Sequence, residues 1–443
     1  MRFRGTTILL VVFALLGGYV YFAEFRGREG REQQKAAEKK AVRFEPKDVA
    51  ELRLTYENTT IVGVRTSESQ WEVRDPQGIE PDNDAWNSLV TSISDIQQDD
   101  AIASSDLVQF GLDNPVLEIG LKLSDGQSTL IQFGSENPRK TQSYLKVSEN
   151  NEVLLTSSKA SSFRKSLTDL RDKKVLEVEP DNIDSITFEK VTLQKTEENW
   201  VLKTPIQAGA DSSEVSTLLG SIQFARAAGF AESSVDLRQA GLDPPSLQLV
   251  LHDANAKTNR VLLLGKELET GKFYAKDGSR PTIFIVDNQI GDKLRRPIFD
   301  WRDKSLVHFD REKLQEIEII RSADRLSARK SEENWLFADG RKLQWDKVSS
   351  MLNTLEFDKA KDIVDSPRAP SAYGLDKPRL EIVLKSGGPS DLRIIFGANS
   401  KVPEGIYLKQ SGNQAVVVAS TDVYDRFNVK AEDLVEAKPA GAE

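Results

Sequence analysis

One short motif occurs three times in this chain of 443 residues, at intervals of 130 and 133 residues. Each copy is a Gly-Leu-Asp triplet followed closely by proline, and the copies begin at Gly111, Gly241 and Gly374. A tryptophan precedes the three glycines by 40, 41 and 39 residues, and another glycine follows them by 23, 24 and 23 residues; these markers are Trp71, Trp200 and Trp335, then Gly134, Gly265 and Gly397. Three markers that keep their order and spacing three times indicate a triplicated module.

The length of the repeat is that of a complete domain. Domains commonly contain about 100–150 residues, whereas solenoid units contain roughly 20–50 and cannot bury a core alone. Hydrophobic residues make up 39% of the chain and charged residues 29%, as in ordinary globular proteins. We therefore expect each copy to fold around its own core.

Composition and charge exclude several classes of protein. The formal net charge is −9, so the chain has no general surplus of Lys and Arg for phosphate, and we expect no nucleic-acid partner. The absence of cysteine excludes disulfides, thiolate zinc sites and thiol catalysis. The two histidines, His252 and His308, fall in different copies, and no phosphate-binding or nucleophile motif accompanies them. We expect no catalytic residue, no metal site and no cofactor.

The N-terminus carries a candidate membrane segment. Gly5 to Ala23 is a run of 19 residues without a charge, and a helix of that length nearly spans a hydrocarbon layer of ~30 Å. A cleaved signal peptide is the alternative, but it needs small residues before the cut, and Tyr21 stands two positions before Ala23. We expect a single-pass anchor with the membrane as one partner.

The charges that flank this segment leave its orientation open. Arg2 and Arg4 favour a cytoplasmic N-terminus. Basic residues between Arg26 and Lys40 lie on the other side and favour the opposite orientation, although glutamates are interleaved among them. That stretch is typical of a polar helical stalk.

These features divide the chain into six segments. The predicted segments are a transmembrane anchor with a short cytoplasmic tail (1–25), a polar stalk (26–42), repeat module 1 (43–173), repeat module 2 (174–304), repeat module 3 (305–434) and a disordered tail (435–443).

The pattern within each copy predicts an α+β module. Each copy opens with an alternating strand, turns through a polar hairpin onto the tryptophan strand, and continues into an amphipathic helix with apolar residues at i, i+3, i+4 and i+7. After the Gly-Leu-Asp turn, four strands and a second amphipathic helix complete the copy. We predict a transmembrane helix followed by three tandem repeats, each a mainly antiparallel sheet with two amphipathic helices.

The repeated residues have structural and functional interpretations. A repeated tryptophan can stack on a ligand, but a large core anchor is the more ordinary role and is the one we predict. Glycine supplies a backbone angle denied to other residues, and Asp113, Asp243 and Asp376 are predicted to bond back to their own turns rather than act as acids. We predict caps for the first helices from Asp84, Asp211 and either Gln344 or Asp346, with a capping box between Asp211 and Glu214.

A fourth marker occurs twice. Leu170-Arg171-Asp172-Lys173 closes the first copy and Trp301-Arg302-Asp303-Lys304 the second, whereas the third offers Phe427-Asn428-Val429-Lys430. The third copy has no module after it. We therefore predict that Arg171, Asp172, Arg302 and Asp303 tie one module's last helix to the first strand of the next. A solvated charge cluster of little energetic consequence is the alternative.

The motifs together resemble a known family. The clearest turns are Phe110-Gly111-Leu112-Asp113-Asn114-Pro115 and Tyr373-Gly374-Leu375-Asp376-Lys377-Pro378, whereas the second copy has Ala240 before its glycine. With the anchor, the tryptophan hairpin and the Leu-Arg-Asp-Lys close, residues 45–430 resemble the bacterial family known as domain of unknown function 4340 (DUF4340). The resemblance implies an accessory part of an ABC-type transport system of the gliding-motility class. It also implies a body outside the cytoplasm, an inner-membrane location and no catalytic residue.

Three functions are consistent with these observations. The first is a non-enzymatic anchored protein whose modules hold a protein partner or an exported substrate near an ABC-type permease. The second is an enzyme that acts on an envelope polymer through carboxylates between modules, which a facing pair roughly 5–9.5 Å apart would favour. The third is a structural spacer that sets a distance from the membrane.

Overall fold

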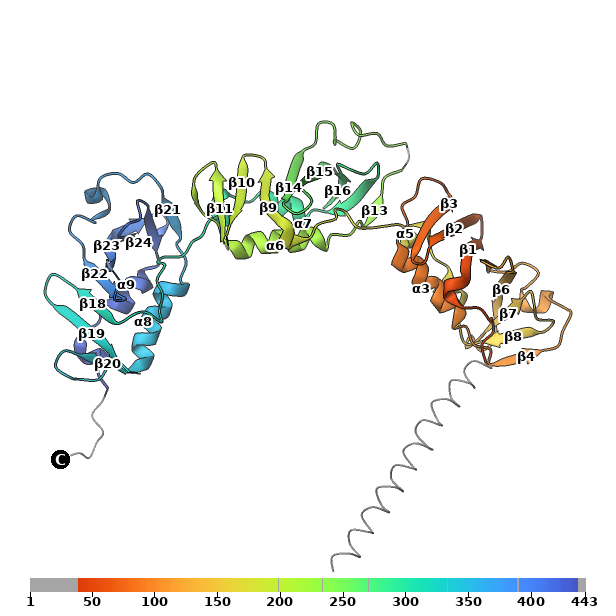
Figure 1. Ribbon diagram of the computed structural model, residues 1–443, viewed down its shortest axis with the longest axis horizontal. Helices are drawn as coiled ribbons and strands as arrows, with labels where there is room; N and C mark the ends of the chain where they lie inside the picture. Colours follow the sequence, from red (N-terminus) through yellow and green to blue (C-terminus); the bar gives the residue numbers. More distant parts are fainter. Residues whose placement is uncertain are drawn as a thin grey trace, which may run out of the picture. The chain divides into compact units, whose positions relative to one another are not determined.

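The protein folds into three antiparallel sheets of eight, nine and eight strands, one for each of three tandem β-rich modules (Figure 1). The computed structural model describes residues 39–436 except Glu198, Ser233, Thr270, Glu333 and Pro389. The predicted anchor, most of the predicted stalk and the end of the predicted tail lie outside the described residues.

The described residues gather into two compact units. The first contains the residues up to Val175 together with 226–236 and 282–287. The second contains 176–225, 237–281 and the residues from Asn288 onward.

Module 1 contains one sheet with the strand order β3-β2-β1-β5-β6-β7-β8-β4. Its strands are β1 (Val49–Tyr56), β2 (Thr59–Ser67), β3 (Gln70–Asp75), β4 (Asp100–Ile102), β5 (Leu117–Leu123), β6 (Ser128–Glu136), β7 (Ser143–Val147) and β8 (Val153–Thr156). Its helices are α3 (Asn83–Ser94), α4 (Ala160–Phe163) and α5 (Leu167–Leu170), with 3-10 turns η2 (Pro46–Asp48) and η3 (Val108–Phe110).

Module 2 repeats this order with one added edge strand, as β12-β11-β10-β9-β14-β15-β16-β17-β13. Its strands are β9 (Ile183–Phe188), β10 (Val191–Thr196), β11 (Asn199–Thr204), β12 (Ala208–Gly209), β13 (Gly229–Phe230), β14 (Leu247–Asp253), β15 (Thr258–Glu269), β16 (Lys272–Asp277) and β17 (Ile283–Asp287). Its helices are α6 (Ser212–Gln223) and α7 (Gln289–Leu294), with 3-10 turns η4 (Pro180–Asn182) and η5 (Ile298–Trp301).

Module 3 has the order β20-β19-β18-β22-β23-β24-β25-β21. Its strands are β18 (Glu316–Ile320), β19 (Arg325–Ser331), β20 (Asn334–Phe337), β21 (Asp362–Val364), β22 (Leu380–Lys385), β23 (Leu392–Lys401), β24 (Glu404–Gln410) and β25 (Val416–Ala419). Its helices are α8 (Trp345–Phe357), α9 (Thr421–Phe427) and α10 (Ala431–Leu434), with the 3-10 turn η6 (Pro370–Tyr373).

The long helix of each module connects the two edges of its sheet. In module 1, the chain leaves the edge strand β3, forms α3 and returns at the opposite edge as β4. The apolar stripe of α3, formed by Trp86, Leu89, Val90 and Ile93, is buried in one core with inward residues of the central strands β1 and β5. The period of the apolar residues therefore produces a sheet with one face covered by the long helix.

The second helix of each module is shorter and more broken than the continuous amphipathic helix predicted. In module 1 it is two turns, α4 and α5, and Ser166 starts α5 with a capping box to Asp169. In module 2, Pro297 follows α7 and cannot donate a helical hydrogen bond, so a 3-10 turn replaces the continuation. One long helix and two short turns thus serve each sheet.

Two cap predictions for the long helices also need correction. The side chain that caps α3 belongs to Asp82, which accepts from the Ala85 amide at 3.0 Å, and not to Asp84. Asp211 caps α6 as predicted, with bonds from Ser213 and Glu214, but the Glu214 carboxylate reaches Arg296 instead of closing a capping box.

The Gly-Leu-Asp turn folds back onto the sheet face opposite the long helix. Its glycine is left-handed in every module, with φ of 66° at Gly111, 65° at Gly241 and 68° at Gly374. The following leucine is buried on that face, where Leu112 packs with Phe110 and Val153, and Leu375 packs with Tyr373 and Val416. Each module therefore has a small second core under the turn.

The third repeated glycine marks where this turn meets the sheet. A Cβ on Gly134 would lie 2.2 Å from the Phe110 carbonyl oxygen. The distance would be 2.2 Å from the Ala240 oxygen at Gly265 and 2.1 Å from the Tyr373 oxygen at Gly397. Real Cβ atoms do not approach a backbone oxygen so closely, so the contact explains why a glycine stands 23 or 24 residues after each turn.

Two Gly→Ala changes in module 2 test this contact with opposite expected signs. Gly265→Ala should lower the free energy of unfolding by about 2 kcal/mol or more, because the new Cβ forces the turn off the sheet. Gly220→Ala, in the interior of α6 with open space around it, should raise stability by roughly 0.5–1 kcal/mol. Denaturant unfolding followed by tryptophan fluorescence measures both. Equal effects of the two variants would refute the contact.

Candidate functional site

The three repeated tryptophans lie inside the module cores. Trp71 in β3, Trp200 in β11 and Trp335 in β20 are all buried. Trp71 stacks on Trp86 with ring centroids 5.3 Å apart, and its Nε1 donates to Asn87 Oδ1 at 2.8 Å. A buried ring has no free face for a ligand, so the geometry favours the core role for these residues.

The aspartates of the three turns are exposed and belong to separate modules. Asp243 lies 3.8 Å from Arg238, an exposed partner. Within the described residues, Asp113 and Asp376 make no side-chain hydrogen bond, so the predicted bond back to the turn is not seen at these two positions. The left-handed glycine and the buried leucine hold the turn instead.

Backbone pairing shows which segments close the three modules. The Leu170, Trp301 and Leu434 carbonyls accept from the residues that cap the long helices, Asp82, Asp211 and Gln344. The next residues, Arg171, Arg302 and Val435, form the same isolated bridge. The counterpart of the Leu-Arg-Asp close in module 3 is therefore Leu434-Val435-Glu436, and its assignment to Phe427-Asn428-Val429-Lys430 was wrong, because Phe427 ends the preceding helix α9.

The residue after each close already pairs within the next module. Asp303 donates its amide to the Gly209 carbonyl of module 2, whereas the adjacent Lys304 accepts from Ala360 of module 3. Lys173 accepts in the same way from Ala227 and Lys39 from Gln98. Module 1 therefore begins near Lys39, inside the predicted stalk, and Val42 is part of its core.

The two closing arginines contact equivalent parts of the following module. Arg302 forms a bidentate ion pair with Asp365, directly after β21, through contacts of 2.8 and 2.6 Å. Arg171 lies over the ring of Phe230 in β13, with Cζ 3.6 Å from the centroid. Their partners lie at the end of the sheet where β21 and β13 run, and not on the first strand that the prediction named.

The second closing aspartate pairs with one of the two histidines. Asp303 Oδ2 lies 2.9 Å from His308 Nε2, and Asp303 Oδ1 accepts from the Ser305 amide at 2.9 Å. The hydrogen bond from Asp303 raises the pKa of His308. Burial raises the pKa of Asp303, but the bonds from His308 and Ser305 outweigh burial and hold that pKa well below its usual range.

The most buried carboxylates of module 3 are held in ion pairs on its sheet. Lys385 Nζ lies 3.0 Å from Glu316 and 2.7 Å from Glu318, and Arg329 adds a 2.8 Å contact to Glu316. Burial raises the pKa of Glu316, but its bonds to Lys385, Arg329 and Ser327 lower that pKa to about 2. These carboxylates cross-link strands and are poorly suited to proton transfer. Across the described part of the chain, no three His, Asp or Glu side chains gather as metal ligands.

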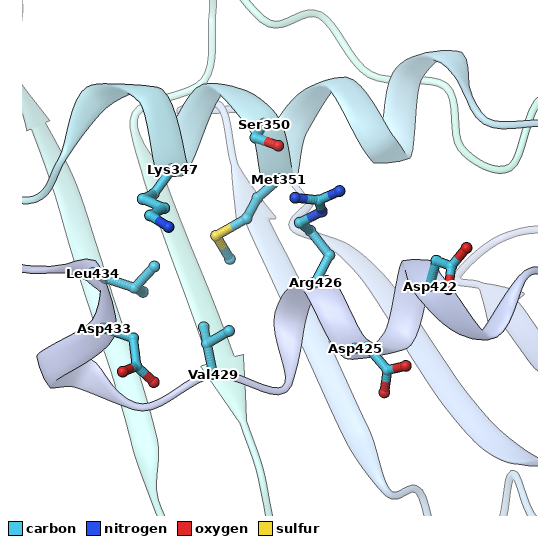
Figure 2. Close-up of a pocket in the computed structure, with 9 residues that line it drawn as sticks. All are labelled: Lys347, Ser350, Met351, Asp422, Asp425, Arg426, Val429, Asp433 and Leu434. Carbon is cyan, nitrogen blue, oxygen red and sulfur yellow. The ribbon is translucent and has the colours of Figure 1, made fainter.

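A groove of about 370 Å³ lies in module 3 between α8 and the pair α9 and α10. Its floor is apolar and is formed by Met351, Val429 and Leu434. Figure 2 shows Lys347 and Arg426 directed into the space between the helices, whereas Asp425 and Asp433 point away from α8. The remaining lining residues are Ser350 and Asp422.

Hydrogen bonds hold the walls of this groove in place. The Gln344 amide donates to the Leu434 carbonyl at 2.8 Å, and its side chain donates to the Val435 carbonyl at 2.8 Å, which joins α10 to the start of α8. Arg321 Nη1 donates to the Val429 carbonyl at 2.6 Å. The floor is therefore preformed by the fold.

Module 2 fills the corresponding space with an ion pair and a larger ring. Glu214, Arg296 and Trp301 occupy the positions of Lys347, Val429 and Leu434. Arg296 lies 2.7 Å from Glu214 and 3.1 Å from Asp300, and the Trp301 ring is fully buried. The hydrogen bond from Arg296 lowers the pKa of Glu214, as expected for a stable ionic contact.

The groove residues were not among the predicted site residues. Each is ordinary alone, and the difference emerges only when Lys347, Val429 and Leu434 are compared with their counterparts in module 2. The incorrect assignment of the third closing segment shifted that comparison by seven residues, from Leu434 to Phe427. The correct alignment of the repeats would have supplied the signal.

A double-mutant cycle tests the Arg302–Asp365 contact. Arg302 is 7% exposed, so removal of either partner should cost stability and the coupling energy should be about 1–3 kcal/mol. Lys313 and Asp310 form a matched control, because they lie 2.7 Å apart but are exposed. Chemical unfolding of Arg302→Ala, Asp365→Ala and the double variant measures the coupling. A value no larger than that of the control pair would contradict a stabilising joint.

The His308 contact predicts a pH dependence. Because its pKa is raised from 6.5 in the folded protein, its contribution is fully present below pH 6.5 and is lost as the pH rises through the folded value. The unfolding midpoint, measured from pH 5 to 9, should fall more steeply for the native chain than for His308→Gln. His252, the other histidine, is unchanged in this comparison. Identical slopes would refute the contact.

Comparison with known proteins places the repeats in a family. The family described as Domain of unknown function (DUF4340) matches residues 71–204 and 200–363, a narrower range than the resemblance over 45–430 suggested. The matches begin at Trp71 and Trp200, the hairpin tryptophans of modules 1 and 2. No curated protein and no solved structure matches the chain. The chain belongs to the DUF4340 family.

Proposed function

We propose that this chain is a non-enzymatic, membrane-anchored protein that acts as a scaffold or binding component of an ABC-type transport or cell-envelope system. The observation that carries the proposal is a common frame with different surfaces. Modules 2 and 3 share strand order and closing contacts, yet module 3 has a groove where module 2 has the Glu214–Arg296 pair. Divergence of one surface on a repeated frame is typical of binding proteins.

The location in this proposal depends on the uncharged run from Gly5 to Ala23 and on the family resemblance. No helix within the described residues is long and apolar enough to cross a membrane. We place the body outside the cytoplasm and the anchor in the inner membrane. The partner in this account is a protein of the transport or envelope complex, and nucleic acid has no part because the net charge is −9.

The alternatives differ in what supports them. The immediate succession of module contacts, as at Asp303 and Lys304, also suits a spacer. The envelope-enzyme alternative needs facing carboxylates in a pocket, whereas Glu316 and Glu318 are tied to Lys385. Binding and spacing are therefore the two functions to separate by experiment.

Deletion of module 2 separates them. Removal of 174–304 joins Lys173 to Ser305, and because Lys173 and Lys304 occupy equivalent positions, the joint keeps its local sequence. Purification of the tagged chain from native membranes should recover an ABC-type transport component with the full chain and with the deletion. Deletion of module 3 should abolish the recovery.

The outcomes assign the function directly. Loss of the partner with either deletion to a similar degree would support a spacer and contradict a docking module. Failure of the full chain to recover any transport or envelope component would contradict the proposed association. Expression and membrane content of each variant, measured by immunoblot, control for misfolding.

A further inference from the structure

We propose that the groove of module 3 binds a polypeptide segment in which a carboxylate side chain stands beside a large aliphatic side chain. The inference rests on the proposed binding function and names the chemistry of the partner. The groove lies on the one module whose long helix carries Lys347 in place of the glutamate of module 2.

The floor of the groove suits an aliphatic side chain. Met351 and Leu434 are buried at its base, and Val429 completes an apolar surface between the helices. The volume of about 370 Å³ falls at the small end of the range for ligand sites, which suits a few side chains rather than a whole cofactor. Methionine is flexible and polarizable, so the floor adapts to different aliphatic shapes.

The two cations of the groove supply a place for one carboxylate. Lys347 on α8 and Arg426 on α9 direct their side chains into the same space (Figure 2). Among the residues that the structure describes, neither makes an ion pair or side-chain hydrogen bond. A carboxylate between them would gain charge-assisted hydrogen bonds while its neighbour covers the apolar floor.

The surrounding acids disfavour ligands of higher negative charge. Asp422, Asp425 and Asp433 also line the groove, so its carboxylates outnumber its two cations. A nucleotide, a polyphosphate or a strongly anionic lipid surface would meet net repulsion there. A singly charged side chain in an otherwise apolar segment satisfies both requirements, as in peptides that dock between helices.

The sequence offers a reporter inside the groove. The chain contains two methionines, Met1 and Met351, so ¹³C-methyl methionine labelling gives one resonance at the groove floor. The full chain in lipid nanodiscs is titrated with a blocked peptide, Ala-Leu-Glu-Leu-Ala, and with the same peptide carrying Gln in place of Glu. Met351→Leu assigns the signal by its loss.

The Glu peptide should shift the Met351 methyl resonance in a saturable manner. The Gln peptide should bind about tenfold more weakly, which corresponds to about 1.4 kcal/mol. Equal binding of the two peptides, or no shift with either, would overturn the proposal. Tighter binding of inorganic pyrophosphate than of the Glu peptide would also overturn it.

A double variant tests whether the groove itself binds the peptide. Lys347→Glu with Val429→Arg installs the residues that fill this space in module 2, Glu214 and Arg296. The variant should abolish the saturable shift, whereas Lys313→Glu, the same charge change at an exposed lysine outside the groove, should leave it intact. Unchanged binding by the double variant would overturn the proposal, and unfolding curves establish that both variants are folded.

These results are independent of the membrane purification. Recovery of a transport component without peptide binding would overturn the proposed ligand chemistry and leave the proposed function standing. Peptide binding without recovery of any such component would support the groove chemistry and contradict the proposed association.

Discussion

Each module is closed by a glycine of the sheet that lies against a backbone carbonyl of the Gly-Leu-Asp turn. At Gly397 even one added carbon would fall 2.1 Å from the Tyr373 oxygen, and the same geometry recurs at Gly134 and Gly265. The contact places the leucine of the turn over one face of the sheet while the long helix covers the other. Because it uses backbone atoms and two glycines, it constrains few side chains elsewhere, and the outer surfaces are free to diverge.

That freedom is used at two places. At the joints, Arg171 stacks on Phe230 and Arg302 binds Asp365, so one position in the frame makes a cation–π contact in one module and an ion pair in the next. Beside the long helix, module 2 closes its surface with Glu214 and Arg296, whereas module 3 leaves a groove with an apolar floor. The repeated core and the variable surface have separate physical origins.

The sequence predicted the features that recur. The alternating strands, the tryptophan hairpins and the left-handed glycines follow from local periodicity and backbone sterics. The pairing of Arg302 with Asp365, 63 residues later, follows no period and could not be read from spacing. The groove escaped prediction because it consists of departures from the repeat, and because Phe427 was matched to the wrong closing residue.

The claim that module 3 carries the binding surface is tested most directly by site-specific photocrosslinking in native membranes. A benzoylphenylalanine at Ser350, which lines the groove, is compared with one at Thr217, the equivalent position on the long helix of module 2. The account predicts a discrete crosslinked protein from Ser350 and none from Thr217. Crosslinks of equal strength from both positions, or a crosslink from Thr217 alone, would contradict it.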